Sequence, residues 1–150
     1  MVFESKGKKL LNLVVTTVLL GSIIGCSNQK YSQCQSIIAI ANAANNQAQQ
    51  VTSAASEKVV TLKSWLQAAN IMRKAAQRIE NLPTKDPQLI QYQENLASVF
   101  NIYSQAIYEA VKARENKNLS ALKVARENAQ KAEKLNQTLV AQINSYCSQK

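Results

Sequence analysis

The stretch Thr52-Ser53-Ala54-Ala55-Ser56-Glu57 decides how many helices this chain forms. Apolar residues recur at three- and four-residue spacing from Ile37 to Ile79 without a slip at this stretch, so periodicity alone would allow one helix over residues 34–81. That helix would be about 70 Å long, against roughly 45 Å for each later helical segment, and part of its apolar stripe would lack a partner. Ser56 as an N-cap, with Glu57 in the first turn, favours a break near residues 52–57. We therefore expect an all-α, antiparallel up-and-down four-helix bundle, with a three-helix bundle containing one long first helix as the alternative.

The other helix boundaries are marked more clearly. Asp86-Pro87 combines an N-cap aspartate with a proline at the first helical position. Asn116-Lys117-Asn118 marks the turn before the last helix, and Asn118 is the candidate cap of that helix. From residue 26 onward the chain has no glycine and only two prolines, Pro83 and Pro87, which is the composition of a helical domain.

Two cysteines lie near the ends of the helical region. Four antiparallel helices would bring Cys34 and Cys147 to the same end, whereas three helices would place them too far apart to bond. In an oxidising compartment this even pair is expected to form a disulfide that encloses nearly the whole domain. The alternative is two buried free thiols.

The N-terminal segment predicts export and a lipid anchor. Lys6, Lys8 and Lys9 precede an apolar run, Leu10 to Ile24, that is too short to cross a bilayer comfortably. The run ends in Ile23-Ile24-Gly25-Cys26, which has the form of a lipobox, where a bacterial lipoprotein is acylated on cysteine and cleaved just before it.

This interpretation divides the chain into three parts: a signal peptide over 1–25, a lipidated (palmitate-type) cysteine with a short polar tether over 26–33, and a helical domain over 34–150. The alternatives are an uncleaved anchor helix, or an ordinary signal peptide with a chance cysteine. We expect an exported protein that is held on the periplasmic, lumenal or cell-envelope side of a membrane.

Site chemistry is sparse. The chain has no histidine and no metal, nucleotide or nucleophile motif, so we expect no enzyme activity, no metal and no cofactor. The carboxylates after residue 26 are scattered, and Glu109 with Lys112 and Glu127 with Lys131 have the spacing of surface ion pairs.

Positive charge is the strongest functional signal. From residue 26 onward, 15 basic minus 8 acidic residues gives +7. A basic cluster is expected at the end of the bundle far from the anchor. Its members are Lys112, Arg114, Lys117, Lys123 and Arg126. A second set would lie near the membrane, namely Lys30, Arg78, Lys85 and Lys150. The basic cluster would suit an acidic membrane-protein partner or anionic lipid, while export argues against nucleic acid. The alternative is a solvated basic face that only confers solubility.

The aromatic residues allow two interpretations. Trp65 falls beside Leu66 on the apolar stripe and is expected in the core, with an edge position in a contact surface as the alternative. Tyr92, Tyr103 and Tyr146 are in stripe register, whereas Tyr108 falls beside the stripe and is expected to be exposed.

Several sequence passages carry a resemblance. They are Trp65-Leu66-Gln67-Ala68-Ala69, Ala75-Ala76, Ile79-Glu80, Asp86-Pro87-Gln88-Leu89, Tyr92-Gln93 and Ile143-Asn144-Ser145-Tyr146-Cys147. With the lipobox and Cys34, they resemble a family of small, helical cyanobacterial lipoproteins of uncharacterised function. The resemblance implies a helical fold and a membrane location, and no active site. By architecture the domain is also similar to the lipid-anchored four-helix extrinsic subunits of photosystem II, which is an analogy of fold alone.

These observations together predict a lipid-anchored, non-catalytic accessory protein that docks on a membrane surface through the basic cluster. The alternative is a carrier that holds a small apolar ligand in the bundle core. A third interpretation is an enzyme with an unfamiliar site.

Overall fold

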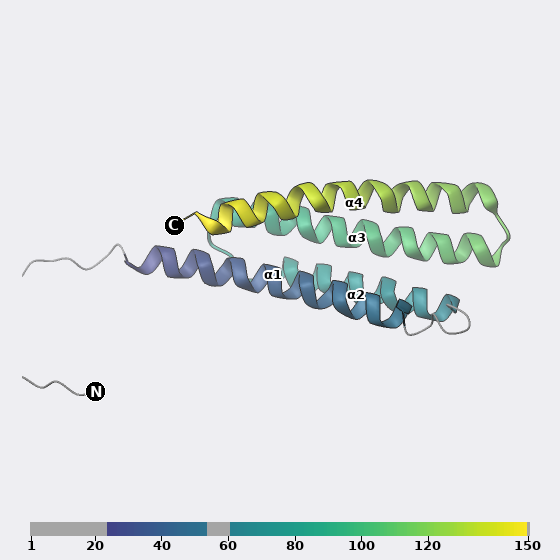
Figure 1. Cartoon of the computed structure of the whole chain (residues 1–150), viewed down its shortest axis with the longest axis horizontal. Helices are drawn as coiled ribbons and strands as arrows, with labels where there is room; N and C mark the ends of the chain where they lie inside the picture. The colour runs from purple at the N-terminus through teal and green to yellow at the C-terminus, as the bar shows by residue number, and fades with distance from the viewer. Residues whose placement is uncertain (1–23, 54–60, 150) are drawn as a thin grey trace, which may run out of the picture.

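The computed structural model describes residues 24–53 and 61–149, with side chains from residue 29 on. This part of the chain contains four helices and no strand: α1 (Ile24–Ser53), α2 (Leu62–Glu80), α3 (Pro87–Glu115) and α4 (Leu119–Ser148). Figure 1 shows the helices running up and down along one long axis, with α3 and α4 side by side. The predicted all-α, antiparallel four-helix arrangement is confirmed. A single long first helix is excluded because α1 and α2 pack against each other, which two parts of one continuous helix could not do.

The start of α2 differs from the prediction. Its N-cap is Thr61, whose Oγ1 accepts a hydrogen bond from the backbone N–H of Ser64 at 3.3 Å. The prediction of Ser56 as the cap is therefore wrong, and Ser56 itself lies outside the described residues. A helix needs one side-chain acceptor for its free N–H groups, and several hydroxyl residues here compete for that role.

The start of α3 was predicted correctly. The Asp86 carboxylate accepts a hydrogen bond from the Leu89 N–H at 2.9 Å, and Pro87 occupies the first helical position. One turn further, the buried Gln93 Nε2 donates to the carbonyl oxygens of Ile79 at 2.7 Å, Glu80 at 3.0 Å and Leu82 at 3.2 Å. The two N–H groups of this α3 side chain are thus shared among three carbonyl oxygens in and just after the last turn of α2, where i+4 donors run out.

The turn between α3 and α4 has the hydrogen bonds of a Schellman motif. The Asn118 N–H donates to the Ala113 carbonyl at 2.8 Å, and the Lys117 N–H donates to the Arg114 carbonyl at 3.2 Å. Lys117 occupies the left-handed position of this motif with φ 52°, where glycine is the usual residue. Asn118 then caps α4 by accepting from the Ala121 N–H at 3.0 Å, as predicted.

The large core residues gather in the half of the bundle that contains the two cysteines. Phe100, Ile37, Ile79, Leu89 and Leu96 are all fully buried there. In the other half the buried residues are small. They include Ala48, Ala68, Ala69, Ala106, Val111, Ala113, Ala125 and Ala132. The core is therefore made of large side chains in the disulfide half and of small ones, mostly alanine, in the other half.

The four helices also pack unevenly around the bundle. α2 and α3, α3 and α4, and α1 and α2 pack against each other extensively, whereas α1 has few contacts with α3 and α4. α1 is therefore held mainly by α2, and its covalent link to α4 is the bond between Cys34 and Cys147.

Candidate functional site

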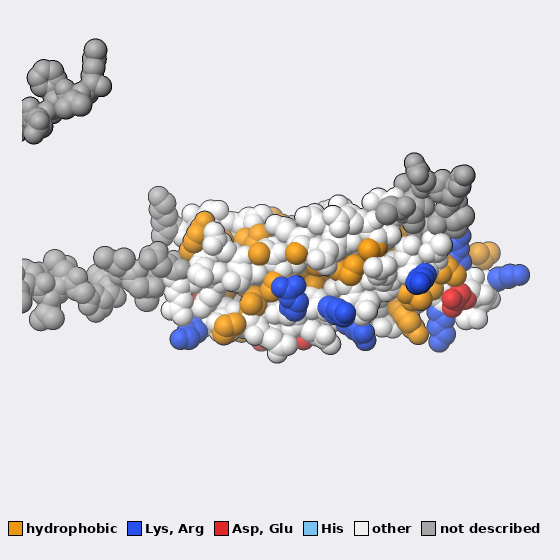
Figure 2. All heavy atoms as spheres, turned by 90° about the horizontal axis from the view of Figure 1, so that it is seen from below, with side chains coloured by type: hydrophobic (Ala, Val, Ile, Leu, Met, Phe, Trp, Pro, Cys, Tyr) orange, Lys and Arg blue, Asp and Glu red, His pale blue; other side chains and the backbone are white. Residues whose placement is uncertain are grey.

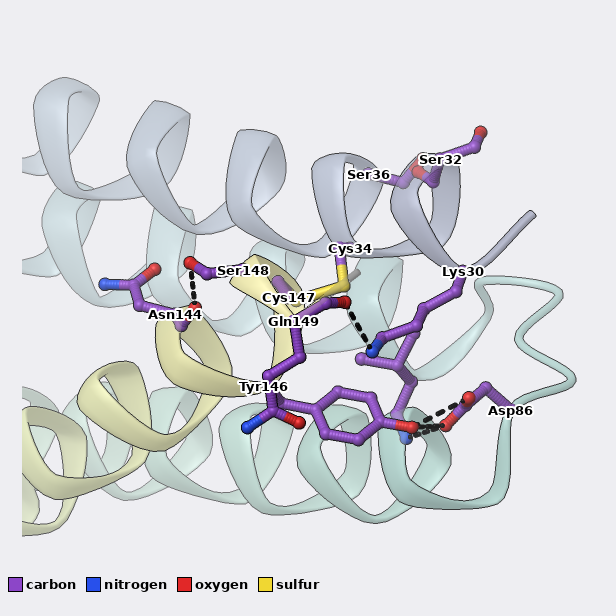
Figure 3. The surroundings of a disulfide bond; sticks show 11 residues. Lys30, Ser32, Cys34, Ser36, Asp86, Asn144, Tyr146, Cys147, Ser148 and Gln149 are labelled. Atoms are coloured by element: carbon purple, nitrogen blue, oxygen red, sulfur yellow. Dashed lines mark hydrogen bonds between the residues drawn. A yellow bond between two sulfur atoms is a disulfide. The ribbon is translucent and has the colours of Figure 1, made fainter. Parts of the chain in front are cut away.

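The two cysteines meet at one end of the bundle. Cys34 in α1 and Cys147 in α4 form a disulfide with their Cα atoms 6.0 Å apart (Figure 3). The pair lies 113 residues apart in the chain, so the bond links the first helix to the last. This confirms the predicted disulfide and the prediction that four helices would bring the two cysteines together.

A polar cluster surrounds the disulfide. Figure 3 shows the Tyr146 ring reaching from α4 to Asp86, and its hydroxyl donates to that carboxylate at 2.9 Å (Oδ2) and 3.0 Å (Oδ1). Lys30 of α1 lies over the Tyr146 ring, 4.0 Å from its centroid, and donates to the Gln149 carbonyl at 3.2 Å. Burial, then the hydrogen bond and charge of Asp86, raises the pKa of the Tyr146 phenol. These contacts hold the ends of α1 and α4 to the start of α3, and sequence analysis did not find them.

The disulfide end is also the N-terminal end of the described chain. α1 begins at Ile24, so the backbone of Cys26 and of the expected tether, residues 26–33, is helical. The other residues of the leader, Ile23 included, lie outside the described residues, as does the basic Lys150. Lys30 and Lys85 lie at this end, as expected from the up-and-down order, since the Lys85 N–H donates to Gln33 Oε1 at 3.3 Å.

The basic cluster lies at the opposite end. Lys112 and Arg114 are in the last turn of α3, Lys117 is in the turn, and Lys123 and Arg126 follow in the first turns of α4. All five side chains are exposed. Figure 2 shows basic and hydrophobic side chains gathered side by side near this end, with few acidic ones on the face presented.

The expected ion pairs differ from those observed. Within the described residues the single salt bridge joins Lys123 to Glu127 at 3.9 Å, instead of Glu127 to Lys131. The Glu109 carboxylate accepts from Gln105 Nε2 at 2.9 Å instead of pairing with Lys112. Both predicted pairs are wrong because surface carboxylates have several partners within reach on a helix, at nearly equal energy. The basic cluster consequently keeps most of its positive charge.

A groove opens beside the basic cluster. It has a volume of about 550 Å³ and is bounded by the start of α2, the end of α3 and the start of α4. Its walls are mostly apolar, and three cations lie among them. The lining residues are Leu62, Trp65, Ala106, Ile107, Ala110, Val111, Arg114, Leu119, Leu122, Lys123, Ala125, Arg126 and Ala129.

The groove follows from unequal helix lengths. α2 has 19 residues and α3 has 29, which corresponds to about 28 Å and 43 Å at 1.5 Å per residue. Because α2 and α3 meet at the Gln93 contact, the start of α2 stops short of the α3–α4 turn. Small residues of α3 and α4, among them Ala106 and Ala125, then form the floor of the groove.

Trp65 lies at the edge of this groove. Its side chain is 38% exposed, so the expected core position is wrong. The residue lies at the edge, as in the alternative, while a role in a contact surface stays a prediction. Leu119 at the α4 start is 80% exposed, and Tyr108 is exposed as predicted. The groove was not predicted from the sequence, although two large apolar residues three positions apart at the start of a helix, Leu62 and Trp65, are its signal.

Tyr103 forms a separate contact between α3 and α4. Its hydroxyl donates a hydrogen bond to the Glu133 carboxylate. Burial, then the hydrogen bond and charge of Glu133, raises the pKa of this phenol above its usual range. The contact joins α3 to α4 through one side-chain hydrogen bond.

No protein-family description, curated protein or solved structure matches the chain. Within residues 24–53 and 61–149, no cluster of three or more His, Cys, Asp or Glu side chains could hold a metal ion. The helices in those ranges also include none with the length and apolar character needed to span a bilayer.

Proposed function

We propose that this chain is a lipid-anchored, non-catalytic accessory protein that binds an acidic partner protein through its basic cluster. The observation that carries the proposal is the placement of five exposed cations at the end of the bundle opposite the N-terminal end of the described chain. The anchor would be Cys26, acylated after export, in keeping with the leader and lipobox of the sequence.

The position of the cluster favours a protein over the anchoring lipid as partner. α3 is about 43 Å long, so an upright bundle would hold the cluster roughly 40 Å from the membrane surface. Attraction to anionic lipid falls off within about 10 Å at moderate salt. A partner that projects from the membrane, with an acidic face at that height, matches this geometry.

The test is cross-linking in native membranes, affinity capture and mass spectrometry with a charge-reversal variant. Lys112→Glu/Lys117→Glu reverses two cations that do not line the groove. A matched control, Lys74→Glu/Lys85→Glu, makes the same charge change at exposed lysines elsewhere on the bundle. The proposal predicts a reproducible acidic partner whose capture is lost in the first variant and kept in the control. Equal capture by both variants would contradict docking through the basic cluster.

The anchor has its own test. Cys26→Ser should move the protein from the membrane fraction to the soluble fraction, because acyl chains supply about 0.8 kcal/mol for each buried methylene. A wash in 1 M salt, where the Debye length is about 3 Å, separates this anchoring from charge attraction. Membrane attachment of Cys26→Ser that persists through the wash would refute lipidation as the main anchor.

A further inference from the structure

The groove at the basic end has the features of a ligand site. Its volume of about 550 Å³ falls within the roughly 300–1,000 Å³ of small-molecule sites. It is open on one side and has apolar walls, while its charged lining residues are all cationic: Arg114, Lys123 and Arg126. A purely apolar ligand would give these three cations no anionic partner, and a cationic ligand would be repelled by them.

We propose that this groove binds a soluble single-chain amphipathic anion, such as a medium-chain fatty carboxylate. The inference goes beyond the docking function and stands independently of it. The carboxylate would lie among Arg114, Lys123 and Arg126, and the acyl chain would lie on the alanine floor.

The dimensions of the groove set the length of the chain. On α4 the lining runs from Leu119 to Ala129, a rise of ten residue steps, or about 15 Å at 1.5 Å per residue. On α3 it runs from Ala106 to Arg114, about 12 Å by the same rise. With C–C bonds of about 1.5 Å, an extended zigzag of about ten to twelve carbons has this length.

The lining also distinguishes the parts of the ligand. Ala106, Ala110, Ala125 and Ala129 lack bulky side chains and leave a shallow apolar floor for methylene groups. Leu62 and Trp65 of α2 form one wall, and burial of the chain against them contributes about 25 cal/mol per Å² of apolar surface. Of the three cations, Lys123 is shared with Glu127, whereas Arg114 and Arg126 have no salt-bridge partner among the described residues. The two guanidinium groups can therefore bind a carboxylate in the bidentate manner.

Trp65 makes the test direct, because it is the single tryptophan of the chain. The full-length protein is placed in phosphatidylcholine vesicles and titrated with 11-bromoundecanoate, whose terminal bromine quenches tryptophan fluorescence on contact. We expect saturable quenching by this probe. 11-Bromoundecanol, of the same length and without charge, should bind about tenfold more weakly or not at all, since exposed charge pairs contribute up to about 1 kcal/mol each.

Two variants assign the binding to the groove. Arg114→Gln/Arg126→Gln should weaken quenching by 11-bromoundecanoate about tenfold. The control Lys112→Gln/Lys117→Gln removes the same charge outside the groove and should leave quenching unchanged. Ala129→Leu, which fills the floor, should abolish saturable quenching while the helical circular dichroism is retained.

Defined outcomes overturn the proposal. The proposal is wrong if 11-bromoundecanoate gives no saturable quenching of Trp65. It is also wrong if 11-bromoundecanoate and 11-bromoundecanol quench equally. Dimers in sedimentation whose formation protects Trp65 from the probe would assign the groove to a second copy of the chain instead. None of these results depends on capture of a partner protein, so this proposal and the docking function can fail separately.

Discussion

Reducing the Cys34–Cys147 disulfide should remove a large part of the free energy of unfolding of the bundle. The bond closes a loop of 113 residues and joins α1 to α4, two helices that otherwise have few contacts. The chain-entropy treatment gives about 4.8 kcal/mol for a loop of this length at 25 °C. Native domains have total stabilities of about 5–15 kcal/mol, so the loss is a large fraction of the total.

Thermal unfolding measures the loss. For a domain of this size each kcal/mol corresponds to roughly 2–8 °C, so we expect the Tm to fall by about 10–40 °C on reduction. In urea the reduced chain should also show a larger m-value, because its unfolded state is no longer held compact by the bond. Native-state hydrogen exchange should rise most in α1, which keeps its packing on α2 and only a few contacts with α3 and α4.

The control is the Cys34→Ala/Cys147→Ala variant, which should melt at the temperature of the reduced protein and show no response to reductant. The entropic reasoning is refuted if the oxidised and reduced proteins melt within about 2 °C of each other while thiol titration shows that reduction was complete.

Further predictions concern the α3–α4 turn and the half-buried phenols of Tyr103 and Tyr146. Lys117→Gly should stabilise the protein by about 1 kcal/mol in urea unfolding, because φ 52° suits glycine; a loss of stability would refute strain at this position. Tyr146→Phe should cost about 1.5–2 kcal/mol through loss of the hydrogen bonds to the Asp86 carboxylate, whereas an unchanged Tm would show that water replaces them. The pKa values of Tyr103 and Tyr146 are raised by folding, so the stability from both phenols is complete below about pH 10 and is lost as the pH rises through their folded-state values. The Tm measured from pH 8 to 12 should therefore decline more gently in Tyr103→Phe/Tyr146→Phe than in the native protein, and parallel declines would contradict this assignment.

The sequence allowed the helix count and the disulfide to be predicted because both follow from periodicity and length. One helix over residues 34–81 would have been longer than the helices it packs against. A break in it was also required to place Cys34 and Cys147 at the same end of the bundle. Asp86 and Asn118 were identified as caps because each stands alone before a clear apolar pattern. The lipid anchor and the docking partner stay predictions, since neither follows from the packing of the helices.

The start of α2 could not be predicted from local signals. Thr52, Ser53, Ser56 and Thr61 all carry hydroxyl groups that can cap a helix, and their intrinsic preferences differ by a few tenths of a kcal/mol. Tertiary packing decides between them. Since α2 starts at Leu62 instead of near residue 57, it is too short to cover the ends of α3 and α4, and Trp65 lies at the edge of a groove instead of in the core. The wrongly predicted N-cap of α2 thus explains why the groove was not predicted and why Trp65 was expected in the core.

The disulfide also determines how the protein responds to mechanical load. Force applied to the N-terminal segment is transmitted along the first three turns of α1 to Cys34. From there the disulfide transmits it directly to Cys147. The 113-residue span between the two cysteines, about 370–410 Å if fully extended, is shielded from that tension. Force applied between the two ends of the chain can therefore stretch only the short segments outside the cysteines. In single-molecule pulling the oxidised protein should show no unfolding step, and the hidden length should appear only after the bond is reduced.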